Sequence, residues 1–270
     1  MNMVGSKIVY QTLGSYPGMP FESAMTMASE RHSPAEIQHV QLCPQNYGCV
    51  DEAIDSLRAA FPQTRFRLHA NVRISGHDRH FDASSEGLAA DAYFRALGAL
   101  SASMGAQVYT LHAGTHQGRP LKRLFDRIAW LEDCIGHRVG VEGHYPAKGN
   151  PYWLSSWAEY AELLTSRTAF ALDLSHLHIV ACRSGRAEKG LTAELLASDA
   201  CVEVHLSAND GVHDLHARLD DGPEPWWMPL LDRIQPASDV FYEGNEIRSS
   251  LSAASVRERM RRAVAPVIAA

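Results

Sequence analysis

The sequence predicts an α/β protein, a (β/α)8 TIM barrel that forms a single domain over residues 1–270. Short apolar runs alternate with longer helix-like stretches, and there are eight such units, the number that closes a parallel sheet into a barrel. No composition shift or Gly/Ser-rich linker marks a domain boundary. An open, doubly wound sheet is the alternative fold, but the stretch "TLGSYPG" after the first strand lacks the expected GxGxxG phosphate turn.

Each predicted strand is rich in β-branched, apolar or aromatic residues and is followed by turn-forming or polar residues. The predicted strands span residues 7–13, 36–42, 65–70, 107–113, 138–143, 168–174, 201–207 and 239–245.

Helix-like stretches separate the strands, and several carry start and stop signals. Residues 84–105 open with Ser84 or Ser85 as the predicted cap, and residues 120–136 begin with Pro and end with Gly. The last predicted helix has a basic face, which we interpret as solvated surface. The other predicted helices span residues 20–31, 50–60, 155–164, 191–198, 225–234 and 253–268.

The composition is that of a globular protein, with 46% hydrophobic and 21% charged residues. The net charge of −6 provides no field that favours nucleic acid or an anionic membrane as a partner. The apolar runs are too short to span a bilayer, and the N-terminus lacks the pattern of a signal peptide. The five cysteines form no CxxC pair, so we expect a reduced, cytoplasmic protein.

Potential metal ligands stand at the C-terminal ends of six consecutive predicted strands. In a (β/α)8 barrel these ends converge on the mouth that holds the active site. From the third strand to the eighth, the residues are His69, His112, Glu142, Asp173 with His176, His205 and Glu243.

The stretch "EVHLSANDGVHDLHARLDDG", residues 203–222, adds further donors. We favour Asp214 and His216, because alternating positions of an extended segment face the same way. The alternatives are Asp210 and His213.

The stretch "DLSHLHI" after the sixth strand offers two histidines. The spacing of three residues from Asp173 favours His176, and His178 is the alternative. Imidazole and carboxylate ligands suit Zn, Fe and Mn, and one divalent ion takes three to six ligands, so nine converging donors indicate two or three ions. Bound cations would also relieve the repulsion among the acids of the mouth.

This order of donors resembles the ligand order of the xylose isomerase-like TIM-barrel superfamily, in its trinuclear branches. Those branches are endonuclease IV and the multinuclear iron-dependent oxidative enzymes that modify ribosomal peptides, as in methanobactin biosynthesis. The segments "VGVEGHYPAKGNPYWLSSWAEYAELLTSRTAFALDLSHLHIVA" and "LHANVRIS" look most like the iron branch. Two features depart from it: Gly143 stands where Asn usually follows the bridging Glu, and the seventh strand reads "HLSAND".

The resemblance implies a role for each donor. Glu142 would bridge two ions, and Glu142, His205 and Glu243 would carry the catalysis. The first ion would be completed by His69 and His112, the second by Asp173, His205 and Glu243, and the third by His176, Asp214 and His216.

The first function that the resemblance implies is that of an oxygen-dependent oxidoreductase with two to three iron ions. These ions can differ in oxidation state. The substrate of such an enzyme would be a cysteine or another donor side chain of a ribosomally made peptide, which a separate leader-peptide recognition protein would present. The candidates for substrate binding are Arg73, Arg119, Arg183, His116 and His144.

Three other functions are open. A sugar isomerase or epimerase would use one Mn or Mg ion at Glu142, Asp173, His205 and Glu243, with the two glutamates as bases. A trinuclear zinc phosphodiesterase of the endonuclease IV type would attack phosphorus with a metal-bound hydroxide, although the chain lacks a basic stripe for DNA. The last is a metal-binding scaffold without enzymatic activity.

Overall fold

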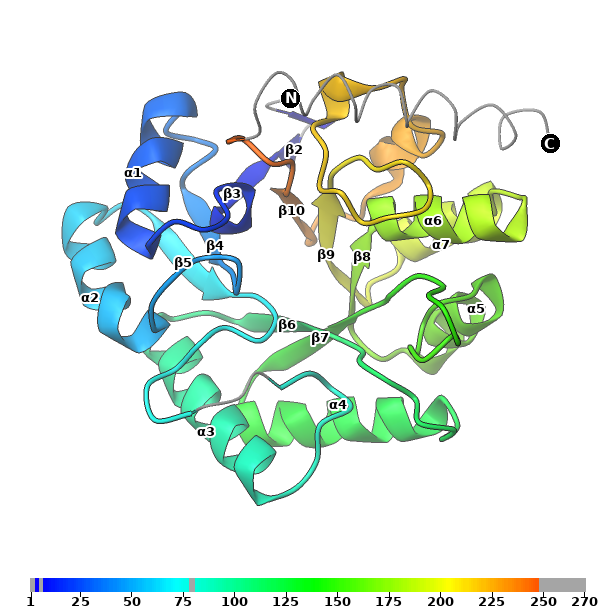
Figure 1. Ribbon diagram of the computed structural model, residues 1–270, viewed down its shortest axis with the longest axis horizontal. Helices are drawn as coiled ribbons and strands as arrows, with labels where there is room; N and C mark the ends of the chain where they lie inside the picture. Colours follow the sequence, from blue (N-terminus) through cyan, green and yellow to red (C-terminus); the bar gives the residue numbers. More distant parts are fainter. Residues whose placement is uncertain (1–2, 5–6, 78–80, 248–270) are drawn as a thin grey trace.

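The computed structural model describes residues 3–4, 7–77 and 81–247. Eight parallel strands form a nearly closed barrel with helices around its outside (Figure 1), which confirms the predicted fold. A two-stranded antiparallel ribbon, β1 (Met3–Val4) and β2 (Lys7–Ile8), precedes the barrel. The barrel strands are β3 (Tyr10–Thr12), β4 (His39–Leu42), β5 (Arg65–Leu68), β6 (Val108–His112), β7 (Arg138–Glu142), β8 (Phe170–Asp173), β9 (Cys201–Leu206) and β10 (Asp239–Tyr242).

The strand order is β5-β4-β3-β10-β9-β8-β7-β6, so β5 and β6 are the two edges that must meet. They meet through one parallel bridge between His69 and Thr110, where the Ala70 N–H donates to the Thr110 carbonyl over 2.8 Å. The barrel therefore closes at the level of the strand ends, where the predicted donors lie.

Seven α-helices lie on the outside of the barrel within the described residues (Figure 1). The Ser156 side chain caps α5 by accepting from the Glu159 N–H, and Glu159 accepts in return from the Ser156 hydroxyl. The helices are α1 (Phe21–Arg31), α2 (Val50–Ala60), α3 (Leu88–Ser103), α4 (Lys122–Ile135), α5 (Trp157–Ser166), α6 (Leu174–Ser184) and α7 (Lys189–Ala197). The 3-10 helices are η1 (Leu13–Ser15), η2 (Leu219–Asp221) and η3 (Met228–Arg233).

Helix α6 was not among the predicted helices. Residues 174–181 are all buried, so this helix has no polar face and its sequence shows no amphipathic stripe. Residues 225–234 were predicted as an α-helix, but only the 3-10 helix η3 forms there, with a proline in its first turn. The predicted helix over 253–268 lies outside the described residues.

The predicted capping of residues 84–105 was also wrong. Helix α3 begins at Leu88 after Gly87, and neither serine caps it. The hydroxyls of Ser84 and Ser85 instead donate to Asp82 Oδ1 over 2.6 and 3.2 Å. The local turn around Asp82 competes with the cap, as short polar side chains often do.

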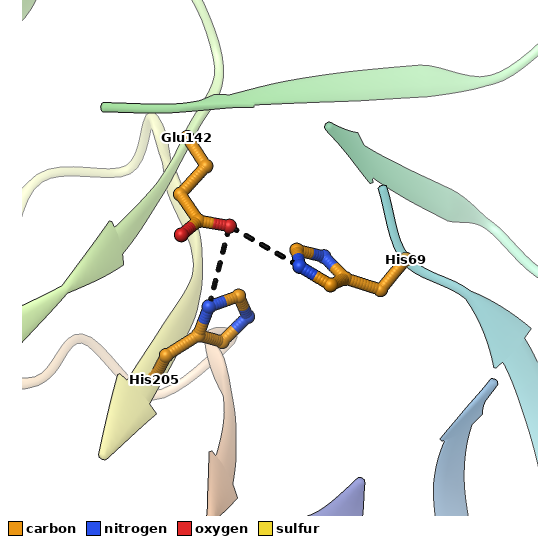
Figure 2. Close-up of side chains that lie close together, drawn as sticks. All are labelled: His69, Glu142 and His205. Carbon is orange, nitrogen blue, oxygen red and sulfur yellow. Dashed lines mark ion pairs between the residues drawn. The ribbon is translucent and has the colours of Figure 1, made fainter. Parts of the chain in front are cut away.

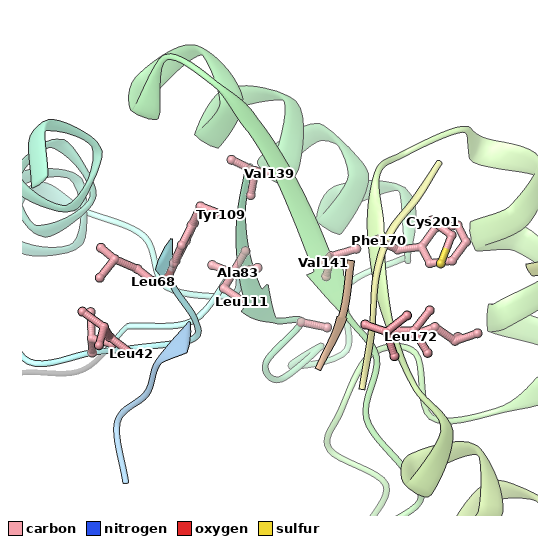
Figure 3. Close-up of a cluster of buried hydrophobic side chains, with 14 of the residues drawn as sticks. Leu42, Leu68, Ala83, Tyr109, Leu111, Val139, Val141, Phe170, Leu172 and Cys201 are labelled. Atoms are coloured by element: carbon pink, nitrogen blue, oxygen red, sulfur yellow. The ribbon is translucent and has the colours of Figure 1, made fainter. Parts of the chain in front are cut away.

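Alternation along the strands separates an apolar outer face from a polar interior. Figure 3 shows outward side chains such as Val139 and Val141 of β7 in the layer between barrel and helices. The intervening inward positions carry Thr110, Glu142 and Glu203, which make contacts across the barrel. Burial of each outer Val, Leu or Phe contributes roughly 1.5–3 kcal/mol, so the outer layer holds the fold while the interior stays polar.

Across the described chain, none of the helices combines the length and the apolar character that crossing a membrane requires.

Candidate metal centre

Three buried side chains, one directly after β5 and the others from β7 and β9, meet at the barrel mouth (Figure 2). His69 Nε2 lies 3.3 Å from Glu142 Oε2, and His205 Nδ1 lies 3.4 Å from the same oxygen. All three residues are buried, and their donor atoms lie within 4.8 Å of one another. Two imidazoles and one carboxylate in this arrangement could hold one metal ion.

A second group shares Glu142 and adds Asp173 and His176. Asp173 Oδ1 accepts from the backbone N–H groups of Ser175 and His176 over 2.6 and 3.1 Å, so Asp173 caps α6. His176 Nδ1 donates to the Gly143 carbonyl over 2.8 Å, which turns His176 Nε2 toward Asp173 Oδ2 at 3.4 Å. The start of α6 therefore places His176 in the cluster.

A third group joins Asp173, His205 and Glu243. Glu243 Oε1 lies 3.6 Å from His205 Nδ1. Its other oxygen, Oε2, lies 3.8 Å from His216 Nδ1, which extends the cluster into the loop after β9.

The loop after β9 is closed by a bridge between Ala208 and Ala217, whose N–H and carbonyl groups pair over 2.8 and 2.7 Å. This small closed loop brings Asp214 Oδ2 to 3.1 Å from His216 Nε2 and 3.3 Å from His176 Nε2. The short loop after β9 therefore brings both of its predicted donors, Asp214 and His216, into contact with the cluster.

His112 is the most loosely held of the predicted ligands. Its Nε2 lies 3.8 Å from Glu142 Oε1, and 31% of its side chain is exposed. All nine predicted ligands thus belong to one network of contacts within 4 Å, which we call the mouth cluster. Of the nine, His112, Asp214 and His216 lie outside the three tight groups.

The mouth cluster contains lone pairs that no protein donor satisfies. Glu142 Oε2, Asp173 Oδ2 and Asp214 Oδ1 are buried without a hydrogen-bond partner. Among the described residues, the ion pairs of its four carboxylates are with histidines alone and include no Lys or Arg. Buried acceptors that lack a fixed cation fit a bound metal ion.

The electrostatics agree with this fit. Burial lowers the pKa of His69 to about 3, so its ring is neutral and offers a lone pair. Burial raises the pKa of Glu243 to about 7. Burial opposes protonation of His205 and His216, but neighbouring carboxylates outweigh it: the pKa of His205 lies well above its ordinary value, and that of His216 is raised to about 10. In the metal-free cluster, the protonated rings of His205 and His216 therefore supply the positive charge beside the carboxylates.

The alternative ligands lie elsewhere. His178 lines a small cavity with Ser175 and Ser207, and its Nε2 lies 3.7 Å from Cys182 Sγ. Asp210 accepts from the backbone of its own turn, and the His213 side chain is 60% exposed. The structure brings His176 and Asp214 into the mouth cluster and leaves these alternatives outside it.

Two of the predicted substrate contacts are histidines near the mouth. The His144 ring stacks between His112 and Tyr152, at centroid distances of 5.3 and 4.4 Å. His116 instead joins two loops, since its Nε2 donates to the Asn150 carbonyl over 2.6 Å. His144 lies beside the mouth cluster, whereas His116 has a structural contact.

The three predicted substrate arginines differ in position. Arg73 is exposed on the loop after β5. Arg119 pairs with Glu86 over 3.1 Å and lies over the Trp153 ring at 5.3 Å. Arg183 does not stand on a loop at the mouth, because it occupies the last turn of α6, at the end remote from Asp173.

Glu203 was not predicted, although it contacts two of the ligands. It is fully buried, with Oε1 2.5 Å from His205 Nε2 and 3.8 Å from His69 Nδ1. The available signal was a charged residue two positions before a ligand, on the inward side of an otherwise apolar strand.

Gly143 stands where the iron branch usually has Asn, and its packing gives a reason for the glycine. A Cβ at this position would lie 2.2 Å from the Tyr160 hydroxyl oxygen, which donates to the His144 carbonyl over 3.1 Å. The ring of Tyr160 therefore fills the space that the side chain of Asn would need.

Comparisons with known proteins give structural matches only. No protein-family model and no curated protein sequence matches the chain. A D-tagatose 3-epimerase-like protein is similar over 97% of this chain and 98% of its own, with 13% identity and a TM-score of 0.63. A xylose isomerase domain protein from Alicyclobacillus acidocaldarius covers 92% of this chain and 98% of its own, with 19% identity and a TM-score of 0.58.

Endonuclease IV from Thermus thermophilus is also similar, over 95% of this chain and 98% of its own, with 16% identity and a TM-score of 0.53. At these identities the likeness shows the fold, and the chain has the fold of the xylose isomerase-like TIM barrels.

Proposed function

We propose that this protein is a metal-dependent enzyme whose mouth cluster holds two to three divalent ions. The observation that carries the proposal is the convergence of nine imidazole and carboxylate donors on one buried network without a Lys or Arg partner in the described chain. Glu142 belongs to two of the three tight groups, which suits the role of a bridging ligand. One ion would leave several of the nine donors without a function.

We propose iron as the metal and dioxygen as the oxidant. His69, Glu142 and His205 form a two-histidine, one-carboxylate set, the donor set of non-haem Fe(II) oxygenases. When bound, iron would supply the redox chemistry, in which a four-electron oxidation consumes one dioxygen and yields two waters. The chain itself would orient His69 Nε2 and His205 Nδ1 toward Glu142 and exclude water around the buried groups.

The proposed substrate is a ribosomally made peptide, with a cysteine or another donor side chain entering the mouth and a separate protein binding the leader. Two exposed apolar side chains of the mouth loops would be available to contact the peptide: Tyr47, after β4, is 62% exposed, and Val212, after β9, is 41% exposed. Arg73 would bind a peptide carboxylate, and His144 would contact the side chain beside the metals.

A second candidate is sugar epimerisation with one Mn or Mg ion at Glu142, Asp173, His205 and Glu243. Asp173, His205 and Glu243 form one of the three tight groups, with Glu142 3.4 Å from His205, which favours a single ion held there. It leaves the other five donors of the mouth cluster without a metal to bind, namely His69, His112, His176, Asp214 and His216. Zinc phosphodiester hydrolysis accounts for all nine donors, but the chain has a net charge of −6.

The experiment that tests the proposal is metal analysis of protein purified without oxygen and without added metal. Two to three irons per chain support iron, three zincs support phosphodiester hydrolysis, and one Mn or Mg supports epimerisation. Absence of bound metal after reconstitution attempts would refute the metal centre. His216→Ala should lower the metal content, whereas the matched variant His213→Ala, outside the cluster, should leave it unchanged.

A further inference from the structure

One buried carboxylate lies directly beneath the mouth cluster. Glu203 Oε1 accepts from Gln41 Nε2 over 2.6 Å, from the Thr110 hydroxyl over 2.9 Å and from His205 Nε2 over 2.5 Å. Its other oxygen, Oε2, pairs with Arg67 Nη2. Both oxygens of this carboxylate are thus committed.

Counting protons shows what this arrangement does to the two imidazoles. An ionised carboxylate only accepts hydrogen bonds, so the proton between Glu203 and His205 belongs to His205 Nε2. His205 Nδ1 is then the atom that faces Glu142 and Glu243, at 3.4 and 3.6 Å.

Glu203 also acts on His69, through the hydroxyl of Thr110. The single hydroxyl proton of Thr110 goes to Glu203, so the oxygen must accept from His69 Nδ1, 2.9 Å away. His69 Nε2 is then bare and faces Glu142 Oε2 at 3.3 Å.

From this geometry we propose that Glu203 is a positioning residue, which fixes the tautomer and ring orientation of His205 directly and of His69 through Thr110. The inference rests on the proposed metal centre and assigns a common support to the two imidazoles of the group His69, Glu142 and His205. Arg67 holds the carboxylate from below, through the pair with Glu203 and a second pair with Asp239 over 3.0 Å. Supports of this kind usually change metal affinity by about 10–100-fold when they are removed.

The test is a titration of metal-free protein with Co²⁺ under anaerobic conditions, followed by visible absorption. Glu203→Gln keeps the shape of the side chain, and we expect it to weaken Co²⁺ binding by about 10–100-fold and to alter the absorption bands. Thr110→Val keeps every charge and should alter the bands with a smaller loss of affinity. The control Asp239→Asn removes a partner of Arg67 that makes no contact with the proposed ligands, and its affinity should match the wild type.

A double variant separates positioning from mere neutralisation of Arg67. Arg67→Met with Glu203→Gln removes both buried charges, so a purely charge-balancing role predicts wild-type affinity, whereas positioning predicts that the loss persists. If Glu203→Gln fails to fold, the double variant and Thr110→Val decide. If the Glu203 variants kept the wild-type Co²⁺ affinity and spectra, the inference about Glu203 would be overturned while the proposed metal centre would stand. Absence of Co²⁺ uptake by the wild type would overturn the metal centre and the inference with it.

Discussion

The barrel interior holds two polar layers, and they differ in the residues that pair with their buried carboxylates. The lower layer, which we call the inner network, consists of Gln41, Arg67, Thr110, Glu203 and Asp239, and its carboxylates pair with the guanidinium of Arg67. The mouth cluster above it has four carboxylates and five histidines, and in the described chain no Lys or Arg pairs with them. The inner network contains its own cation, whereas the mouth cluster lacks one among the described residues, which fits the proposed metal ions.

The largest expected effect concerns the inner network. Arg67→Met leaves Glu203 buried without its counter-charge, which we expect to cost about 3–5 kcal/mol in the free energy of unfolding. Urea denaturation of metal-free protein measures this. A loss below about 1 kcal/mol would contradict the view that the inner network is held by this pair.

The next largest effect is expected in the mouth cluster, where it concerns metal affinity. Glu142→Gln removes a ligand shared by two groups, and we expect it to weaken metal binding by at least about a hundredfold. The rise in Tm that metal produces in the wild type should then disappear, because a ligand stabilises only the state that binds it. Differential scanning calorimetry with and without Fe²⁺ makes the comparison. A retained metal-dependent shift would exclude Glu142 as a bridge.

The packing of Gly143 against the ring of Tyr160 is tested by Gly143→Ala. The new Cβ would lie 2.2 Å from the Tyr160 hydroxyl and 2.6 Å from its ring carbon Cζ, so we expect a loss of about 1–3 kcal/mol in stability. Adding Tyr160→Phe should not restore it, since the ring itself is too close. Thermal unfolding of the single and double variants tests this, and recovery in the double variant would show that only the hydroxyl matters.

Metal binding should depend on pH with a defined sign. The raised pKa values of His205 and His216 mean that both imidazoles carry protons in the metal-free protein at neutral pH. Binding must displace these protons, so affinity should rise with pH, about tenfold per unit for each proton released. Calorimetric titrations in buffers of different ionisation enthalpy count the protons. Binding without proton release would refute the assignment.

The same protonation should change the stability of the metal-free protein in the reverse direction. The folded pKa of His216 is about 10, above its ordinary value of 6.5. Its pair with Asp214 therefore stabilises the metal-free fold fully below pH 6.5, and this contribution is lost as the pH rises through 10. Urea denaturation across this pH range follows the loss.

The smallest expected effect is at Arg183, which is exposed in the last turn of α6. Arg183→Ala should change stability by less than about 0.5 kcal/mol and leave metal affinity and turnover unchanged. Steady-state kinetics with a candidate peptide and chemical denaturation provide the measurements. A raised KM would return Arg183 to the substrate site.

Particular residues show why the convergence of side chains at the mouth could be predicted from the sequence and the contacts one layer below could not. His69, Glu142, His205 and Glu243 could be found because the strand ends of a barrel converge, so position along the strand is enough. Glu203 and Arg67 lie further inside, where contact depends on strand register and on which strands face each other across the barrel. A single sequence does not state that register. Helix α6 was missed for a related reason, since its first eight residues are all buried and so show no alternation of apolar and solvent-exposed positions.

The sequence by itself predicted the eight-stranded parallel fold and the convergence of nine potential donors, six of which fall in the tight groups, because alternation and strand ends are properties of local order along the chain. Only the tertiary structure decided which donors share a group, how the loop after β9 closes through Ala208 and Ala217, and that one carboxylate supports two imidazoles. The physical reason is that such contacts join residues as far apart as Gln41 and Glu203, whose distance is fixed by barrel closure.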